Sequence, residues 1–179
     1  MVSPREYTDL VYNIIGAAMT VHSELNWGLL EPLYTEALHM ELQARGIPNT
    51  MEAHLPCYYK GQVMQKYYQP DLSVKDIIIE LKSTCDIVPA HRAQLFNYMR
   101  LTKSPIGLLI NFGNKSLQGE RYAFIEETNE CVLLDRNMNL LNLVDSDPDP
   151  DDYWRFEEEN RLNEMNSCTI HDVIHGQFT

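Results

Sequence analysis

Apolar residues recur at helical spacing through the first quarter of the chain. Between residues 5 and 25 they fall three or four positions apart, which predicts a helix. An Asn-Trp-Gly stretch at 26–28 interrupts this pattern, and a second helix with one apolar face is predicted over residues 29–45. Gly46 stands where a helix C-cap is expected, and Pro48 follows it. The chain is therefore expected to begin with two helices.

The spacing then changes to one that is typical of strands. Residues 54–59 and 62–72 are rich in β-forming side chains, and the Lys-Gly pair between them is a hairpin signal. A turn over residues 73–76 leads into a further strand at 76–82. We therefore expect three consecutive strands that meander through one sheet.

The next stretch of the chain predicts a helix, a buried strand and a hairpin. A helix is expected from Pro89 to about Thr102, and the apolar run IGLLINF at 106–112 suits a strand that is buried on both faces. Residues 113–119 are expected to form a loop, before a hairpin of residues 121–126 and 131–134. This order of elements predicts an α/β fold, with a mixed β-sheet flanked by helices.

Negative charge is concentrated at the end of the chain. The 179 residues have a formal net charge of −12. Residues 145–179 hold ten acids and two bases, a net charge of −8, whereas residues 1–144 hold sixteen acids and twelve bases, a net charge of −4. We expect a folded domain over residues 1–144, and an acidic linker and C-terminal tail over 145–179 with a short helix at 153–165.

Other features favour a cytoplasmic protein with no membrane segment. The N-terminus lacks the pattern of a signal peptide, and the most apolar run, residues 10–21, is too short to cross a bilayer. The four cysteines contain no CxxC pair, so a zinc or iron–sulfur site is not indicated.

Two acids and a lysine lie around the turn at 73–76. If that turn is a four-residue hairpin loop, Asp71 faces Ile78, and Asp71, Glu80 and Lys82 project from one face with Asp71 diagonal to Glu80. Neighbouring carboxylates repel each other unless a cation lies between them, and Mg²⁺ is commonly held by one or two carboxylates. The pattern therefore suits metal-dependent phosphodiester hydrolysis, although a solvated hairpin with a Glu–Lys pair has the same residues.

Three stretches resemble motifs of one nuclease superfamily. PDLSVKDIIIELK at 70–82 resembles the PD-(D/E)XK nuclease signature. Residues 28–34 have the spacing of the GxxExxY proteins, a bacterial branch of that superfamily, and residues 94–98 are similar to the QxxxY motif of RecB-like nucleases. The motifs occur in the expected order within residues 5–115, and the resemblance implies a restriction-endonuclease-like sheet.

The resemblance also implies roles for the residues of the signature. Asp71 and Glu80 would bind Mg²⁺, or Mn²⁺, together with the backbone carbonyl of Leu81. Lys82 would act on the attacking water. Each of these roles is an expectation drawn from the family motif.

The two other motifs supply three further candidates. Glu31 would lie near the metal and complete or support its ligand shell, and Tyr34, three residues on, could hydrogen-bond its carboxylate. Alternatively, Glu31 is simply an acid favoured in the first turn of a helix. Gln94 and Tyr98 share a helical face and would reach substrate or the lysine. An ordinary amphipathic helix would place them in the same way.

The charge balance leaves the function open. Nucleic-acid binders are usually basic, so the net charge of −12 counts against that class. A local path for DNA exists if Arg92, Arg100 and Lys103 face the cleft with Gln94, but no aromatic-interleaved basic patch is evident and sequence-specific readout is not supported. We expect a Mg²⁺-dependent nuclease acting on DNA. The alternatives are a catalytically inactive binding module with the same fold, or an acidic protein that mimics nucleic acid.

Overall fold

The computed structural model describes residues 3–141 and 154–156. A 3-10 turn, Pro4–Tyr7, comes first. The helices are α1, Thr8–Leu25; α2, Glu31–Ala44; and α3, Pro89–Thr102. The strands are β1, Thr50–Met51; β2, Leu55–Tyr59; β3, Gln62–Tyr68; β4, Leu72–Val74; β5, Ile77–Lys82; β6, Ile106–Asn111; β7, Leu117–Ile125; β8, Glu130–Leu133; and β9, Trp154–Phe156.

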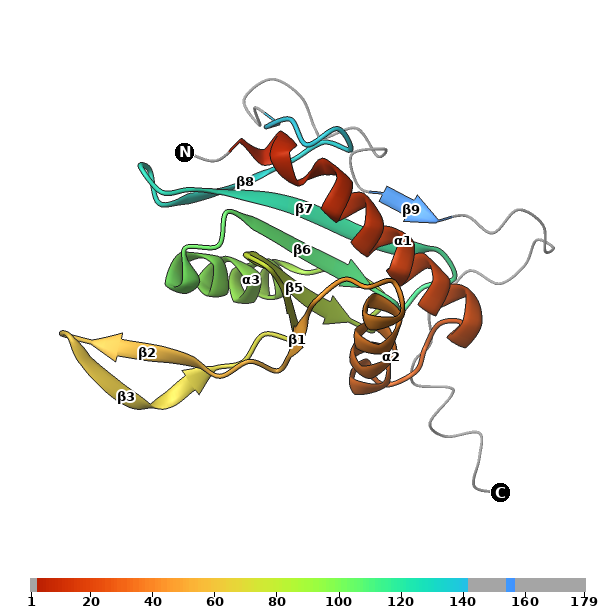
Figure 1. Cartoon of the computed structure of the whole chain (residues 1–179), viewed down its shortest axis with the longest axis horizontal. Helices are drawn as coiled ribbons and strands as arrows, with labels where there is room; N and C mark the ends of the chain where they lie inside the picture. The colour runs from red at the N-terminus through yellow and green to blue at the C-terminus, as the bar shows by residue number, and fades with distance from the viewer. Residues whose placement is uncertain (1–2, 142–153, 157–179) are drawn as a thin grey trace.

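A mixed sheet forms the centre of the fold (Figure 1). Its strand order is β1-β4-β5-β6-β7-β8, and β9 pairs with β7. The pair β5 and β6 is parallel and is joined by α3, since parallel neighbours need a crossover connection. The other pairings within this sheet are antiparallel. The predicted α/β fold with a mixed sheet flanked by helices is confirmed.

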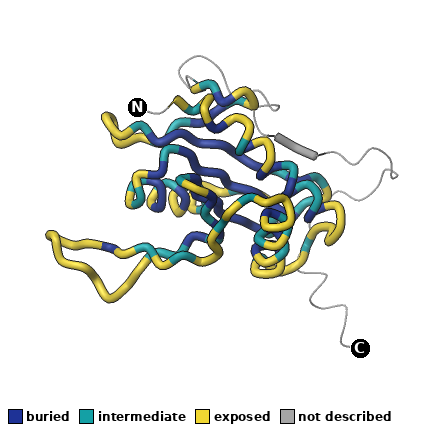
Figure 2. Tube along the Cα trace, in the orientation of Figure 1, coloured by how far each residue is buried: buried dark blue, intermediate teal, exposed yellow. Residues whose placement is uncertain are grey.

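Helices cover both faces of the sheet, and the central strands are buried between them (Figure 2). On one face, Ile77, Ile79 and Leu81 of β5 pack with apolar residues of α1 and α2. On the other face, Ile78 and the β6 strand contribute to a second cluster with α3. Every residue of β6 is buried, as its apolar sequence predicts.

Helix α2 ends and packs as its sequence indicates. Gly46 follows it with φ +70°, a backbone conformation that glycine adopts without strain. The Ile47 N–H donates to the Leu42 carbonyl at 2.9 Å and closes the last turn. Tyr34 stacks on Phe112, just beyond β6, with ring centroids 4.5 Å apart. This contact holds the start of α2 near the ends of β5 and β6.

The region before the central strands differs from its prediction. Strands β2 and β3 pair only with each other among the described residues, so the expected continuous meander does not form. The predicted strand at 62–72 is divided, because β3 ends at Tyr68 and β4 begins at Leu72. Pro70 lies in the break, where it cannot donate to a ladder. The β2–β3 hairpin consequently projects away from the body of the protein (Figure 1).

Two predictions near the end of the domain are wrong. Strand β7 begins at Leu117, inside the expected loop, because it pairs with the whole of β6. The last residue pair of this ladder is Asn111 with Gln118. Residues 154–156 form β9 against β7 where a helix is predicted. The remainder of that predicted helix and the acidic linker lie outside the described residues. Within the described part of the chain, no helix is both long enough and apolar enough to cross a membrane.

An ion pair between half-buried Arg92 and buried Glu120 fixes the start of α3 to the sheet. Arg92 donates through Nε and Nη2 to the two carboxylate oxygens of Glu120 on β7, at 2.8 and 2.5 Å. The Tyr122 hydroxyl donates to the same carboxylate at 2.6 Å. Glu120 is buried, whereas the pair of Lys103 and Glu126 at the other end of α3 is 57% and 68% exposed.

Removing the cation should therefore have different costs at the two ends of α3. Arg92→Ala leaves Glu120 buried without its cation, and we expect the free energy of unfolding to fall by about 3 kcal/mol. Lys103→Ala deletes a cation from an exposed pair and should change it by less than about 1 kcal/mol. Urea unfolding of both variants checks this. Equal losses would contradict a buried, ion-paired Glu120.

Candidate active site

The turn between β4 and β5 decides which side chains meet. It consists of Lys75 and Asp76 only, so Leu72 pairs with Ile79. Lys75 has φ +57° and its ammonium lies over the Tyr7 ring, while the Tyr7 hydroxyl hydrogen-bonds Asp76. These contacts from the N-terminal segment favour the tight turn. The predicted four-residue loop is therefore wrong.

The corrected register brings the two acids closer than predicted. Extending the pairing of Leu72 with Ile79 by one residue places Asp71 directly opposite Glu80, rather than opposite Ile78. The shift is two residues, and because side chains alternate, it leaves every side chain on its predicted face. Glu80 and Lys82 lie on the α3 face of β5, opposite Ile79 and Leu81.

Asp71 lies at the end of β4 and bonds the backbone of β5. Its Oδ2 accepts the Leu81 N–H at 2.6 Å. Burial raises the pKa of Asp71 to about 6, and this hydrogen bond and Lys82 oppose the rise. The Asp71 side chain therefore accepts a backbone hydrogen bond from β5, and its charge is costly in the absence of a further cation.

Glu80 is the most deeply buried acid of the group. Burial, and then the nearby charge of Asp71, raise the pKa of Glu80 to about 8, while Lys82 opposes the rise. Its Oε2 lies 3.5 Å from Lys82 Nζ, and its Oε1 has no hydrogen-bond partner among the described residues. A buried carboxylate oxygen without a partner is unusual in a folded protein and indicates a place for a bound ion or water.

Lys82 joins Glu80 to the start of α2. Its Nζ also lies 3.5 Å from Glu31 Oε1, and Glu31 is the first residue of that helix. The expected hydrogen bond from Tyr34 to Glu31 is replaced by two others. The Tyr34 hydroxyl donates to the Asn26 carbonyl at 2.7 Å and accepts the Leu29 N–H at 3.1 Å. Tyr34 thus fixes the loop that carries Glu31 to the site.

Gln94 and Tyr98 lie on the side of α3 that faces the acids. Gln94 Nε2 donates to the Tyr98 hydroxyl at 3.4 Å, as expected for neighbours on one helical face. That hydroxyl donates to the Gln69 carbonyl at 3.3 Å, two residues before Asp71. Burial raises the pKa of Tyr98, and the charges of Glu80 and Asp71 add to the rise.

Sequence reasoning missed one neighbour of the site and misplaced three cations. Burial and then the charge of Lys82 lower the pKa of His91, and its position in the first turn of α3 was the only signal. Arg92, Arg100 and Lys103 do not form the anticipated cationic path beside Gln94. Arg92 pairs with Glu120, Arg100 donates to the Asn129 carbonyl, and Lys103 pairs with Glu126.

The acids suit a hard divalent cation that keeps part of its water shell. Among residues 3–141 and 154–156, no three His, Cys, Asp or Glu side chains are grouped as in an all-protein metal site. Mg²⁺ does not require such a group, since two carboxylates, a backbone carbonyl and waters suffice. The unpartnered Glu80 Oε1 and the raised pKa values of Asp71 and Glu80 are features that a cation between them would relieve.

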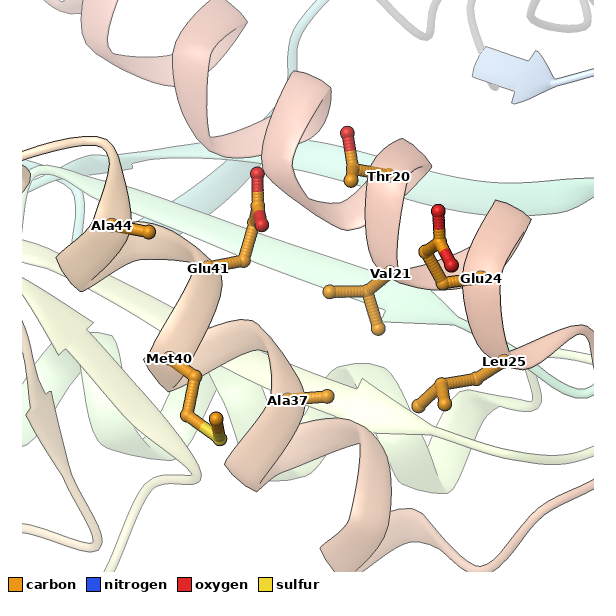
Figure 3. A pocket seen from close by; sticks show the side chains of 8 residues that line it. All are labelled: Thr20, Val21, Glu24, Leu25, Ala37, Met40, Glu41 and Ala44. Carbon is orange, nitrogen blue, oxygen red and sulfur yellow. The ribbon is translucent and has the colours of Figure 1, made fainter.

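A groove between α1 and α2 is separate from these acids (Figure 3). It holds about 440 Å³ and is lined mainly by apolar side chains such as Val21, Leu25 and Met40. Its polar lining includes Glu24 and Glu41 and no lysine or arginine. None of the motif residues lines it, and its acids disfavour a phosphate.

Comparison with known protein families identifies the chain. Residues 8–122 match the family model of the PD-(D/E)XK nuclease superfamily, and the chain belongs to that superfamily. The matched range contains Glu31, the strands that carry Asp71 and Glu80, and the helix with Gln94 and Tyr98. No curated protein and no solved structure gave a match. The superfamily typically uses divalent metals, and membership implies a nucleic-acid substrate.

The raised pKa of Glu80 predicts a pH dependence of stability in metal-free buffer. Glu80 binds its proton more tightly when folded, with a pKa of about 8, than an unfolded glutamate with a pKa of about 4.3. The free energy of unfolding should therefore fall as pH rises towards 8. Glu80→Gln cannot ionise and should flatten the profile between about pH 6 and 8.

Urea unfolding with EDTA at several pH values measures this, and exposed Glu126→Gln is the control. A wild-type profile that stays flat, or that Glu80→Gln leaves unchanged, would show that Glu80 is ionised in the folded protein.

Proposed function

We propose that this protein is a Mg²⁺-dependent nuclease that hydrolyses phosphodiester bonds in DNA. The observation that carries the proposal is the buried Glu80 carboxylate, which lies opposite Asp71 and has an oxygen with no partner among the described residues. A buried glutamate close to a second acid is costly, and a cation that binds between the two acids would explain the arrangement. Membership in a nuclease superfamily supplies the substrate class.

Asp71 and Glu80 would hold the ion, with the Leu81 carbonyl as a third ligand and Glu31 completing or supporting the shell. A bound divalent ion makes water more acidic and neutralises charge on the phosphoryl group. Asp71 is pre-oriented for this role by the Leu81 N–H. Glu31 is held in place by the loop that Tyr34 closes.

Lys82 would orient the attacking water or donate to a phosphoryl oxygen. Its ammonium already lies against Glu80 and Glu31, so it needs only a small rearrangement to meet an anionic substrate. Gln94 and Tyr98 would contact substrate from α3, and Tyr98 also ties that helix to the strand that leads to Asp71.

We further propose that the chain belongs to the GxxExxY branch of the superfamily. The spacing Gly28, Glu31 and Tyr34 has a structural purpose here. Gly28 takes φ +87°, Tyr34 bonds the backbone of the same loop, and Glu31 is thereby directed to Lys82.

A second candidate is a binding module that has this fold and does not cleave. The contacts of Lys82 with both Glu31 and Glu80 favour it, because the site then balances part of its own charge without a metal. Binding of a divalent ion without any strand cleavage would distinguish this module from the nuclease.

The direct test is incubation of linear and circular DNA with Mg²⁺ or Mn²⁺. We expect cleavage by the wild type and a loss of about 100-fold or more in Asp71→Ala and in Lys82→Ala, because one removes a ligand and the other a charge that acts on the reaction. Lys103→Ala removes a cation remote from the acids and should cleave as the wild type does. Cleavage that survives both site substitutions would refute this assignment.

A further inference from the structure

The β2–β3 hairpin, residues 54–68, is an exposed arm, which we call the β2–β3 arm. Its strands pair with no other strand of the described chain. Tyr58 is 64% exposed and Tyr67 is 50% exposed, which is unusual for aromatic residues on paired strands. Figure 2 shows the arm as an exposed ribbon that leaves the buried sheet.

One face of the arm is a row of flat or apolar side chains. Tyr58 pairs with Val63, and Pro56 pairs with Tyr67. The register shifts between these two pairs, but Pro56 and Tyr58 are alternate residues of β2, so Tyr58 lies on the same side as the Tyr67 that faces Pro56. The His54 ring stacks on Tyr67 with centroids 3.9 Å apart, which enlarges the flat surface.

The arm has the opposite charge to the rest of the chain. Residues 53–70 contain Lys60 and Lys66 and no acid, in a chain of net charge −12. The cations of α3, by contrast, are engaged, with Arg92 on Glu120 and Lys103 on Glu126. A nucleic acid that reaches the acids therefore meets favourable charge on the arm.

The base of the arm is attached to the candidate active site. Tyr68 packs edge-on against Tyr98 with ring centroids 5.2 Å apart. The next residue, Gln69, accepts the Tyr98 hydroxyl through its carbonyl, and Asp71 follows two positions later. A strand lying along the arm is therefore led to Asp71.

We propose that the β2–β3 arm binds an unpaired stretch of nucleic acid, whose bases stack on Tyr58 and Tyr67, and guides it to Asp71 and Glu80. This inference rests on the proposed function for its substrate. Stacking needs bases whose faces are exposed, as in single strands, and it tolerates any sequence. Pairing of two arms from separate chains is disfavoured because it would bring lysines together with no acid in either arm.

Binding is measured by fluorescence anisotropy with a labelled 20-nucleotide oligothymidine and the full chain in EDTA. Tyr58→Ala/Tyr67→Ala should weaken binding at least tenfold, because each base stack contributes substantially to affinity. Tyr12→Ala, which removes a tyrosine on α1 that is 77% exposed, should leave it unchanged. Binding of a blunt duplex of the same length should change far less than that of the single strand.

The lysines give a second and independent readout. Lys60→Gln/Lys66→Gln should make the dependence of log affinity on log salt less steep by about 1.4, or about 0.7 for each phosphate that a lysine no longer neutralises. An unchanged salt slope together with unchanged affinity of the tyrosine variant would overturn the inference. A tyrosine variant that changes from dimer to monomer in sedimentation, with equal weakening on single strand and duplex, would assign the arm to self-association instead.

These outcomes are separate from those of the nuclease test, because EDTA prevents cleavage throughout. Arm-dependent binding in a chain that never cleaves DNA would uphold the arm and refute the nuclease. If cleavage needs Asp71 but the arm variants bind DNA as the wild type does, the nuclease is upheld and the role of the arm is refuted.

Discussion

Burial of the Glu80 carboxyl at the end of an apolar strand, near the half-buried Asp71, is the constraint on which the site depends. Ile77, Ile79 and Leu81 hold β5 in the core with α1 and α2, and this fixes Glu80 on the other face, where it is fully buried. The surroundings of Glu80 screen charge poorly, so burial and the nearby charge of Asp71 both disfavour ionisation of Glu80. Lys82 compensates for only part of that cost, and a divalent cation would compensate for the rest.

Two helices, α2 and α3, converge on that strand end, and each is held by its own contact. The stacking of Tyr34 on Phe112 and the bonds of its hydroxyl bring Glu31 to Lys82. The pair of Arg92 with the buried Glu120 holds the start of α3, which carries His91, Gln94 and Tyr98. The site is therefore assembled by the rigid parts of the fold, while the β2–β3 arm extends from it.

Periodicity predicted the helices and the central strands, because their apolar faces are continuous in sequence. Turn length could not be predicted in the same way. The tight turn at Lys75 and Asp76 depends on Tyr7, which is almost seventy residues distant in the chain. Because a two-residue register shift preserves the face of every side chain, the expectation that Asp71, Glu80 and Lys82 share one face does not depend on this error in turn length. The projection of the β2–β3 arm away from the sheet was not predicted, because β-forming residues look the same in an exposed hairpin and in a sheet. Ion pairs such as Arg92 with Glu120 join residues whose proximity only the fold reveals.

Calorimetric titration of Mn²⁺ into the metal-free protein tests the central claim most directly, since it reports on the cation site without requiring a substrate. Wild type should bind Mn²⁺ and release a proton near pH 7, because the pKa of Glu80 is about 8 in the free protein. Glu80→Gln should abolish that binding and its proton release, while Glu126→Gln should bind as the wild type does. Mn²⁺ binding that Glu80→Gln leaves unaltered, or no binding by the wild type, would contradict a metal site between Asp71 and Glu80.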